Sequence, residues 1–296
     1  MMAFRTLVVG TDFSAEAELA IQHATHIAKT MHGSVTLVHA GTIVDLPSAS
    51  DELRAAMFSG LYANYVQEVR EQLAAAQSRV EDDGVTARQY FVGGVADTAL
   101  PRVATELGAD LVAVGGCEHR GVKRALFGGV AERVVRLSRM SVLVAREPAP
   151  RPGYHRVLVP VEFTPDADAA LASAELLAAP GATVEVVHFW EPPSPGRYAP
   201  GTSHRAAVAD LLAASIRYAV RRAGRGLVER RQRVDLDLCF RDVRGSPGRG
   251  IPERAAEDVD LVILGGRRRG GGLRRALSKS VTEAVVRRTP CSVLVM

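Results

Sequence analysis

A short apolar run at residues 111–114 is followed by a pair of glycines that begins at Gly115, as in a buried parallel strand that ends in a loop. The basic loop that comes next ends at Gly128 and Gly129, and a helical pattern starts at Val130. Unpaired backbone N–H groups and the helix dipole attract anions to such an N-terminus. Residues of these types at this spacing therefore predict a phosphate-type site between a strand and a helix.

The same arrangement returns near the C-terminus. Three segments recur after about 150 residues: 7–14 returns at 158–164, 111–116 at 261–266, and 141–144 at 292–295. The counterparts of the phosphate-type site are Gly265, Lys279, Ser280 and Val281. Repetition at a fixed offset indicates a duplicated domain.

An acidic residue follows the first predicted strand of each copy, Asp12 in the first and Glu162 in the second. In a doubly wound parallel sheet the loops after the first and fourth strands meet at the switch point, where ligands bind. A carboxylate suits a ribose hydroxyl or the exocyclic amine of a base better than it suits a phosphate. The pattern thus predicts a nucleotide site. The alternative is that Asp12 only accepts hydrogen bonds from N–H groups near Ser14, a predicted helix N-cap.

Alternating strand and helix patterns predict an α/β fold in each copy. Strands are expected at 6–9, 34–39, 85–92, 111–114 and 142–145, and helices from Ser14 to Gly33, through 53–73, at 96–107 and at 130–137. The last of these helices should place Val130, Val134, Val135 and Leu137 on one apolar side. Each copy should therefore form a doubly wound, five-stranded parallel sheet flanked by helices.

Length and composition fit two such domains. The chain has 296 residues, of which 47% are apolar, and a domain takes ~150 residues on average. We expect domains at 1–147 and 155–296, joined by a proline-rich linker at 148–154. No apolar run approaches the ~20 residues of a membrane helix, so we expect no membrane association and a cytoplasmic protein. The net charge of +4 comes from arginine in the second half and fits a solvated surface better than nucleic-acid binding.

The sequence offers no set of residues spaced for catalysis or for a metal. Cys117, Cys239 and Cys291 are scattered, and neither a Walker A motif nor a Ser/His/Asp set occurs. We expect no catalytic residues and no metal site, and at most slow hydrolysis of a bound nucleotide. His39 and His188 end the second strands, where structural hydrogen bonds are expected of them rather than catalysis.

Five segments of the first copy, 11–14, 38–39, 109–115, 128–132 and 141–144, together resemble the universal stress protein family in its tandem form. The likeness extends over essentially the whole chain. It implies two Rossmann-like domains of the adenine-nucleotide alpha-hydrolase-like kind. It also implies pairing of the fifth strands, 141–145 and 291–296, in an intramolecular pseudo-dimer, with a homodimer as the further assembly considered.

ATP-binding members of that family share the pattern Gly-x2-Gly-x9-Gly-Ser/Thr after the fourth strand. The first copy matches it at Gly115 and Gly128, but has Glu118 at the second glycine and Gly129 at the hydroxyl residue. A carboxylate disfavours a triphosphate nearby. The N–H groups at the helix N-terminus remain available, so we expect binding in this copy.

The second copy departs further from the pattern. It keeps Gly265 and the hydroxyl of Ser280, but Lys279 replaces the third glycine and an arginine insertion at 267–269 displaces the second. A Cβ at a glycine position can block the close approach of a ligand to the backbone. We therefore expect weaker binding here.

The resemblance implies a non-catalytic stress-response regulator that binds ATP or another adenine nucleotide, with Mg²⁺ as a candidate companion ion. The residues expected to hold the nucleotide are Thr11, Asp12, Ala40, Val114, Gly115, Gly128, Gly129 and Val130. A weaker second site is expected at Glu162, Gly265, Lys279, Ser280 and Val281.

The rival hypothesis is a nucleotide-free scaffold. An arginine-rich face in the second half would then bind an acidic protein partner. Its residues are Arg221, Arg222, Arg225, Arg230, Arg231, Arg267, Arg268 and Arg269. Glu118 and Lys279 favour this hypothesis, whereas Asp12, Gly115 and Gly128 favour nucleotide binding.

Overall fold

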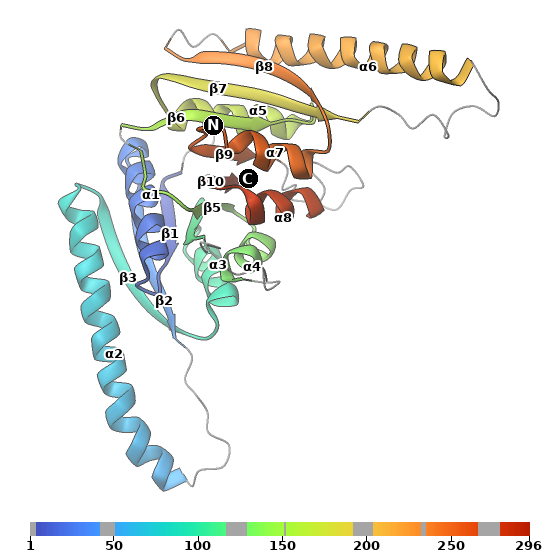
Figure 1. Ribbon diagram of the computed structural model, residues 1–296. Helices are drawn as coiled ribbons and strands as arrows, with labels where there is room; N and C mark the ends of the chain where they lie inside the picture. The colour runs from blue at the N-terminus through green and yellow to red at the C-terminus, as the bar shows by residue number, and fades with distance from the viewer. Residues whose placement is uncertain are drawn as a thin grey trace. The chain divides into compact units, whose positions relative to one another are not determined.

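The computed structural model describes residues 4–41, 51–116, 129–150, 152–191, 204–231, 235–265 and 279–296. Side chains are described in these ranges except at 51–61, 165, 204–210, 212 and 279. The chain divides into two compact units (Figure 1). We call them unit 1, which contains Ala3–Ala149, and unit 2, which contains Pro150–Met296.

Unit 1 alternates strands and helices as the sequence predicts. Its elements are β1 Thr6–Gly10, α1 Ala15–Met31, β2 Ser34–Gly41, α2 Asp51–Asp82, β3 Thr86–Gly93, α3 Ala96–Glu106, β4 Leu111–Gly115, α4 Val130–Leu137 and β5 Ser141–Ala145. The strands are parallel and lie in the order β3-β2-β1-β4-β5. The order reverses between β1 and β4, which confirms the doubly wound sheet.

Helices cover both faces of the unit 1 sheet. Right-handed crossovers place α1 and α2 on one face and α3 and α4 on the other. The central strands are consequently buried on both sides: Leu7, Val8 and Val9 of β1 are 0% exposed. Continuous apolar runs such as 111–114 are the sequence signature of this arrangement.

Helix α1 begins as predicted, because the Ser14 side chain caps it by accepting a hydrogen bond from Ala17 N at 3.2 Å. Its predicted apolar face is buried. The prediction that Gly33 ends the helix is wrong: α1 ends at Met31, and His32 takes the left-handed cap conformation with φ 51°. Gly33 is required for a different reason, since a Cβ there would lie 2.6 Å from Arg5 O.

The helix at 130–137 is confirmed as α4, but its predicted apolar side is only partly correct. Val134 and Val135 are buried, whereas Val130 is 42% and Leu137 46% exposed. Val130 stands in the first turn beside a cavity described below. A one-sided apolar pattern cannot separate burial in a core from exposure to a cavity or to solvent.

Unit 2 repeats the alternation. Its elements are β6 Tyr154–Pro160, α5 Pro165–Leu177, β7 Ala178–Trp190, α6 His204–Glu229, β8 Asp237–Arg244, α7 Pro247–Ala255, β9 Leu261–Leu264, α8 Lys279–Arg288 and β10 Ser292–Val295. Within the unit the strand order is β10-β9-β6-β7-β8, again parallel. Its switch point lies between β6 and β9, the counterparts of β1 and β4.

An aspartate fixes the start of the first strand in both units. Asp110 Oδ2 accepts hydrogen bonds from Arg5 N and Thr6 N, both at 3.0 Å. Asp260 likewise accepts from His155 N at 2.7 Å and Arg156 N at 3.2 Å. These bonds join the beginnings of the two central strands and so help to set the position of their carboxyl ends.

None of the helices in the described ranges is both long and apolar enough to cross a membrane. The pairing of residues 141–145 with 291–296 in a pseudo-dimer stays a prediction.

Candidate functional site

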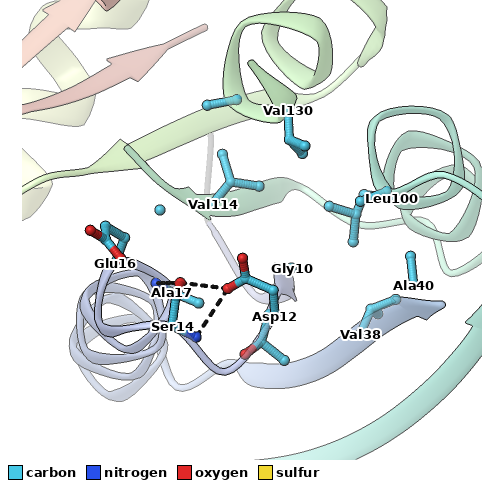
Figure 2. A pocket seen from close by; sticks show the side chains of 14 residues that line it. Gly10, Asp12, Ser14, Glu16, Ala17, Val38, Ala40, Leu100, Val114 and Val130 are labelled. Atoms are coloured by element: carbon cyan, nitrogen blue, oxygen red, sulfur yellow. Dashed lines mark hydrogen bonds between the residues drawn. The ribbon is translucent and has the colours of Figure 1, made fainter. Parts of the chain in front are cut away.

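A cavity of about 490 Å³ lies at the carboxyl ends of β1 and β4, where the strand order of unit 1 reverses. Its size is within the range of ~300–1,000 Å³ that small-molecule sites occupy. The lining residues are Gly10, Thr11, Asp12, Ser14, Glu16, Ala17, Val38, Ala40, Ala96, Leu100, Val114, Gly115, Val130 and Ala131. Figure 2 shows Leu100, Val114 and Val130 across the space from Asp12.

Six of the eight residues predicted for the first site line this cavity: Thr11, Asp12, Ala40, Val114, Gly115 and Val130. Gly129 does not line it but is the N-cap of α4, directly before Val130. Gly128 lies outside the described residues, as do Cys117 and Glu118. Residues that lie far apart in the sequence and were predicted to form one site therefore line the same cavity.

Asp12 accepts hydrogen bonds at the start of α1, and its predicted contact with a ligand stays a prediction. Its Oδ1 accepts hydrogen bonds from Ser14 N at 3.1 Å and from Ser14 Oγ at 2.5 Å (Figure 2). Among the described residues both hydrogen bonds of Asp12 use Oδ1. The carboxylate also lines the cavity, so Oδ2 can serve a ligand while Oδ1 holds the turn.

The turn that carries Asp12 has an unusual backbone at Phe13. Phe13 has φ 65°, a left-handed conformation that bulky residues seldom adopt. Its ring stacks on His39 at 4.8 Å between centroids, and Phe13 N donates to Thr11 Oγ1 at 3.0 Å. Backbone strain of this kind persists where surrounding contacts enforce it and is typical of functional sites.

His39 supports the same turn from behind. Its Nδ1 lies 2.9 Å from Thr11 O and its Nε2 lies 2.9 Å from the hydroxyl of Tyr65. Because a carbonyl oxygen can only accept, Nδ1 carries a proton, and in the neutral ring Nε2 then accepts from the Tyr65 hydroxyl. The predicted structural role of His39 is confirmed. His188 makes the equivalent contact in unit 2, with Nδ1 2.7 Å from Val161 O.

Gly115 has a packing reason to be glycine, in addition to its place beside the cavity. A Cβ added at Gly115 would lie 2.5 Å from both the carbonyl carbon and the carbonyl oxygen of Glu16 in α1. Gly265 in unit 2 is similarly close to α5, at 2.8 Å from Asp166 O. Both glycines therefore allow the first helix to lie against the end of the fourth strand of its unit.

The N-terminus of α4 supplies the anion-attracting end of the site. Gly129 is its N-cap and forms no side-chain capping bond, and Val130 and Ala131 of the first turn line the cavity. Backbone N–H groups of a first turn have no partner within the helix. Together with the helix dipole they favour a negatively charged group at this end of the cavity.

The predicted set of nucleotide-binding residues left out several residues that line the cavity. They are mainly small or apolar: Gly10, Ala17, Val38, Ala96, Leu100 and Ala131. Such residues look like core in a sequence, because their types do not reveal that a cavity interrupts the packing. Ser14 and Glu16 were readable as the first turn of α1, and only the fold shows that this turn reaches the cavity.

The second predicted site differs in its residues and surroundings. Burial raises the pKa of the Glu162 carboxyl, so it holds a proton more readily than an ordinary glutamate. Ser280 and Val281 lie in the first turn of α8, while the side chain of Lys279 is outside the described residues.

A larger change occupies the second strand of unit 2. Phe189 stands where Ala40 stands in unit 1, because it follows His188 as Ala40 follows His39. Its ring packs on α7: a Cβ added at Gly250 would lie 2.2 Å from Phe189 Cε1. An aromatic ring therefore fills space in unit 2 that the methyl group of Ala40 leaves open in unit 1.

The arginine-rich face of the scaffold hypothesis is partly engaged within unit 2. Arg221 Nε donates to Asp242 Oδ1 at 2.8 Å, and Arg231 forms ion pairs with Asp168 and Glu175. The side chains of the remaining described members, Arg222, Arg225 and Arg230, are exposed. Arg267, Arg268 and Arg269 lie outside the described residues.

The fold and the cavity define the class of this molecule. Each unit is a doubly wound α/β domain, and the cavity of unit 1 lies at the switch point where such domains bind ligands. The model of the universal stress protein family matches the chain twice, at residues 3–146 and 153–296. The chain therefore belongs to the universal stress protein family, in a tandem form.

Several known proteins are similar to this chain. A universal stress protein of Methanocaldococcus jannaschii is 28% identical over 145 residues, which are 49% of this chain and 84% of that protein. A solved universal stress protein from Archaeoglobus fulgidus has the same fold, with 18% identity, a TM-score of 0.64 and coverage of 100% of this chain and 97% of that one. Another solved structure is a universal stress protein in complex with cAMP, 27% identical over 48% of this chain and 96% of that one, with a TM-score of 0.35.

Proposed function

We propose that unit 1 binds an adenine nucleotide in the switch-point cavity and that the protein acts as a non-catalytic, nucleotide-binding regulator of a stress response. The observation that carries the proposal is the cavity itself. It joins an apolar end, a carboxylate and a helix N-terminus within about 490 Å³. These three parts correspond to the base, the ribose and the phosphates of a nucleotide.

The apolar end suits a purine base. Val38, Leu100 and Val114 contribute side chains there, and flat apolar surfaces favour the faces of a base. Ala40 adds hydrogen-bonding groups. Alternate residues of a strand direct their peptide groups to the same neighbour, and Val38 O already accepts from Thr11 N at 2.9 Å. The N–H and C=O groups of Ala40 therefore point to the β1 side of β2. The pairing of β1 with β2 has already ended at this level, since its last pair is Gly10 with Val38.

The polar end suits the ribose and phosphates. Asp12 can accept a hydrogen bond from a ribose hydroxyl, as acidic residues do in many dinucleotide-binding folds. The first turn of α4 offers N–H groups to the phosphates. The described residues contain no group of three His, Cys, Asp or Glu side chains fit to hold a metal ion. Mg²⁺ that accompanies a nucleotide commonly binds phosphate oxygens and keeps several waters.

Thermal denaturation with ATP, ADP, AMP, cyclic AMP and GTP tests the proposal, with mass spectrometry of any nucleotide released from the purified protein. A ligand at 100 times its Kd should stabilise unit 1 by about 2.7 kcal/mol. Asp12→Asn keeps an oxygen for Ser14 N but removes the charge, and we expect it to reduce the adenine-nucleotide shift strongly. The matched variant Glu162→Gln in unit 2 should leave the shift intact.

Two outcomes would contradict the proposal. One is the absence of both a co-purified nucleotide and a melting shift. The other is an equal shift with GTP and ATP that Asp12→Asn does not change, which would indicate non-specific anion binding.

A further inference from the structure

Helices α3 and α4 are joined beside the cavity by a charged pair that the nucleotide proposal does not use. Arg133 Nε lies 2.6 Å from Asp97 Oδ2. The Asp97 side chain is 5% exposed, whereas that of Arg133 is 45% exposed. Asp97 stands in the first turn of α3, where the helix dipole favours a carboxylate. The pair is thus anchored on the α3 side and reaches across to α4.

The pair is adjacent to residues that line the cavity. Asp97 follows Ala96, and Arg133 lies one helical turn after Val130. Arg133 N also donates to Gly129 O at 3.2 Å, which closes the first turn of α4. Any change in the distance between α3 and α4 at this level moves the N-terminus of α4 relative to the cavity.

Unit 2 replaces both members of the pair at once. With the offset that aligns Val130 with Val281, Gly248 of α7 stands for Asp97 and Ala284 of α8 stands for Arg133. These small residues face each other, since a Cβ added at Gly248 would lie 3.6 Å from Ala284 Cβ. That distance is ordinary van der Waals contact. At this level unit 1 therefore joins its two helices through two long charged side chains, and unit 2 has two small residues in contact.

We infer that Asp97 and Arg133 are positioning residues, which act as a spacer between α3 and α4 and hold the N-terminus of α4 at the distance that a phosphate group requires. The inference rests on the proposed nucleotide site and adds what sets its geometry. Two small residues in their place would let α4 approach α3. The cavity would then narrow at the end where Val130 and Ala131 line it.

The test compares two double variants of the full chain. Asp97→Ala with Arg133→Ala removes the spacer without leaving a buried charge unpaired, and the contact of Gly248 with Ala284 shows that a methyl group fits such a gap. Asp97→Asn with Arg133→Gln keeps the reach of the two side chains, since Gln extends as far as the Arg133 Nε position, but removes the charges. Calorimetric titration with ATP and with adenosine separates phosphate contacts from base contacts.

The alanine pair should weaken ATP binding by at least about tenfold and adenosine binding by less than about threefold, because α4 holds the phosphates and not the base. The Asn/Gln pair should stay within about threefold of wild type for both ligands. ATP binding by the alanine pair at wild-type affinity would overturn the inference. So would equal losses in the two double variants, because charge and not spacing would then be the cause.

Failure of the nucleotide proposal gives a different result. Wild type would then bind neither ATP nor adenosine, and the spacer is judged from a crystal structure of the alanine pair. A shorter separation of α3 and α4 than in wild type supports the spacer, and an unchanged separation refutes it.

Discussion

Units 1 and 2 share a backbone framework and differ in the side chains that shape the cavity. Both have a phenylalanine with positive φ after the acidic residue, Phe13 at 65° and Phe163 at 53°. In both, a histidine ring nitrogen contacts the backbone carbonyl oxygen just after the first strand. In both, an aspartate accepts hydrogen bonds from backbone N–H groups at the start of that strand. These shared features hold the switch-point loop in place.

The differences are concentrated on the cavity side. Ala40 becomes Phe189, and Thr11, whose hydroxyl accepts from Phe13 N, becomes Val161. The Asp97–Arg133 pair becomes Gly248 and Ala284. A duplicated fold thus keeps what packing requires and changes what a ligand would contact. This contrast supports a nucleotide in unit 1 and a different or purely structural role for unit 2.

The largest effect is expected where packing demands glycine in both units. Gly115→Ala places a Cβ 2.5 Å from the Glu16 backbone, and a helix backbone cannot move aside as a side-chain tip can. We expect Gly115→Ala to lower the free energy of unfolding by about 3 kcal/mol. Gly265→Ala, with its nearest atom at 2.8 Å, should cost somewhat less. Urea denaturation measures both.

Gly129→Ala is the control for this prediction. No atom of the described residues lies within 4 Å of a Cβ added there, so we expect a loss below about 1 kcal/mol. A Gly115 variant as stable as the Gly129 variant would show that α1 moves freely and that the shared framework is less rigid than we argue.

The second prediction introduces into unit 1 the phenylalanine that unit 2 has at the position equivalent to Ala40. Ala40→Phe alone would collide with Ala99, whose counterpart is Gly250. The double variant Ala40→Phe with Ala99→Gly should fold, because it copies a pair that packs in unit 2. Its nucleotide affinity should fall by about 100-fold, or about 2.7 kcal/mol, since the ring occupies the place of the base.

Calorimetric titration with ATP measures the loss. Phe189→Ala in unit 2 is the matched variant and should leave the ATP affinity of unit 1 unchanged. Wild-type affinity in the Ala40→Phe double variant would mean that the base lies elsewhere.

The sequence predicted the fold well, and it placed most of the predicted site residues beside one cavity, for identifiable reasons. Continuous apolar strands, the Ser14 cap and the repeat offset are local signals, and they located every strand of unit 1. Asp12 and Gly115 were predicted to lie near each other because they follow the first and fourth strands, between which the strand order of such sheets reverses. These inferences needed only topology.

What the sequence could not predict depends on contacts between distant residues. Leu100 looked like an ordinary core residue of a helix, and Phe189 looked like an ordinary strand residue. Only the packing of Phe189 on Gly250 shows that a cavity position is filled in unit 2. The Asp97–Arg133 pair was missed because two charges on different helices give no pattern in the sequence.

The third prediction concerns acid sensitivity, which we expect of unit 1 and not of unit 2. His23 in α1 is 1% exposed and its Nε2 lies 2.7 Å from Glu147 O. Burial lowers its pKa from 6.5 to about 4. Because the unfolded chain takes up a proton near pH 6.5 and the folded chain does not, stability falls as the pH drops from 6.5 towards 4 and is unaffected above 6.5. The counterpart in unit 2 is Ser173, which does not titrate.

Unfolding by urea at pH 7.5 and pH 5 should show a loss of about 2 kcal/mol from this histidine. His23→Gln should remove that part of the pH dependence, whereas His32→Asn, at the exposed left-handed cap of α1, should retain it. An unchanged slope in His23→Gln would assign the acid sensitivity to other groups.

The smallest effect is expected at the support of the Asp12 turn. Tyr65→Phe removes the hydroxyl that lies 2.9 Å from His39 Nε2 but leaves the ring, which packs edge-on against Phe91. We expect a loss of about 1 kcal/mol, the usual net value of one partly buried hydrogen bond. Nucleotide affinity should change by less than about twofold, since His39 Nδ1 still holds Thr11 O and hence the turn.

Tyr90→Phe on β3, a 40% exposed tyrosine, is the control and should change neither quantity. A large loss of nucleotide affinity in Tyr65→Phe with little loss of stability would mean that the Tyr65 hydroxyl on α2 acts on the bound ligand. Unit 2 has no such hydroxyl, because at the offset of the third strands the counterpart of Tyr65 in α6 is Ile216.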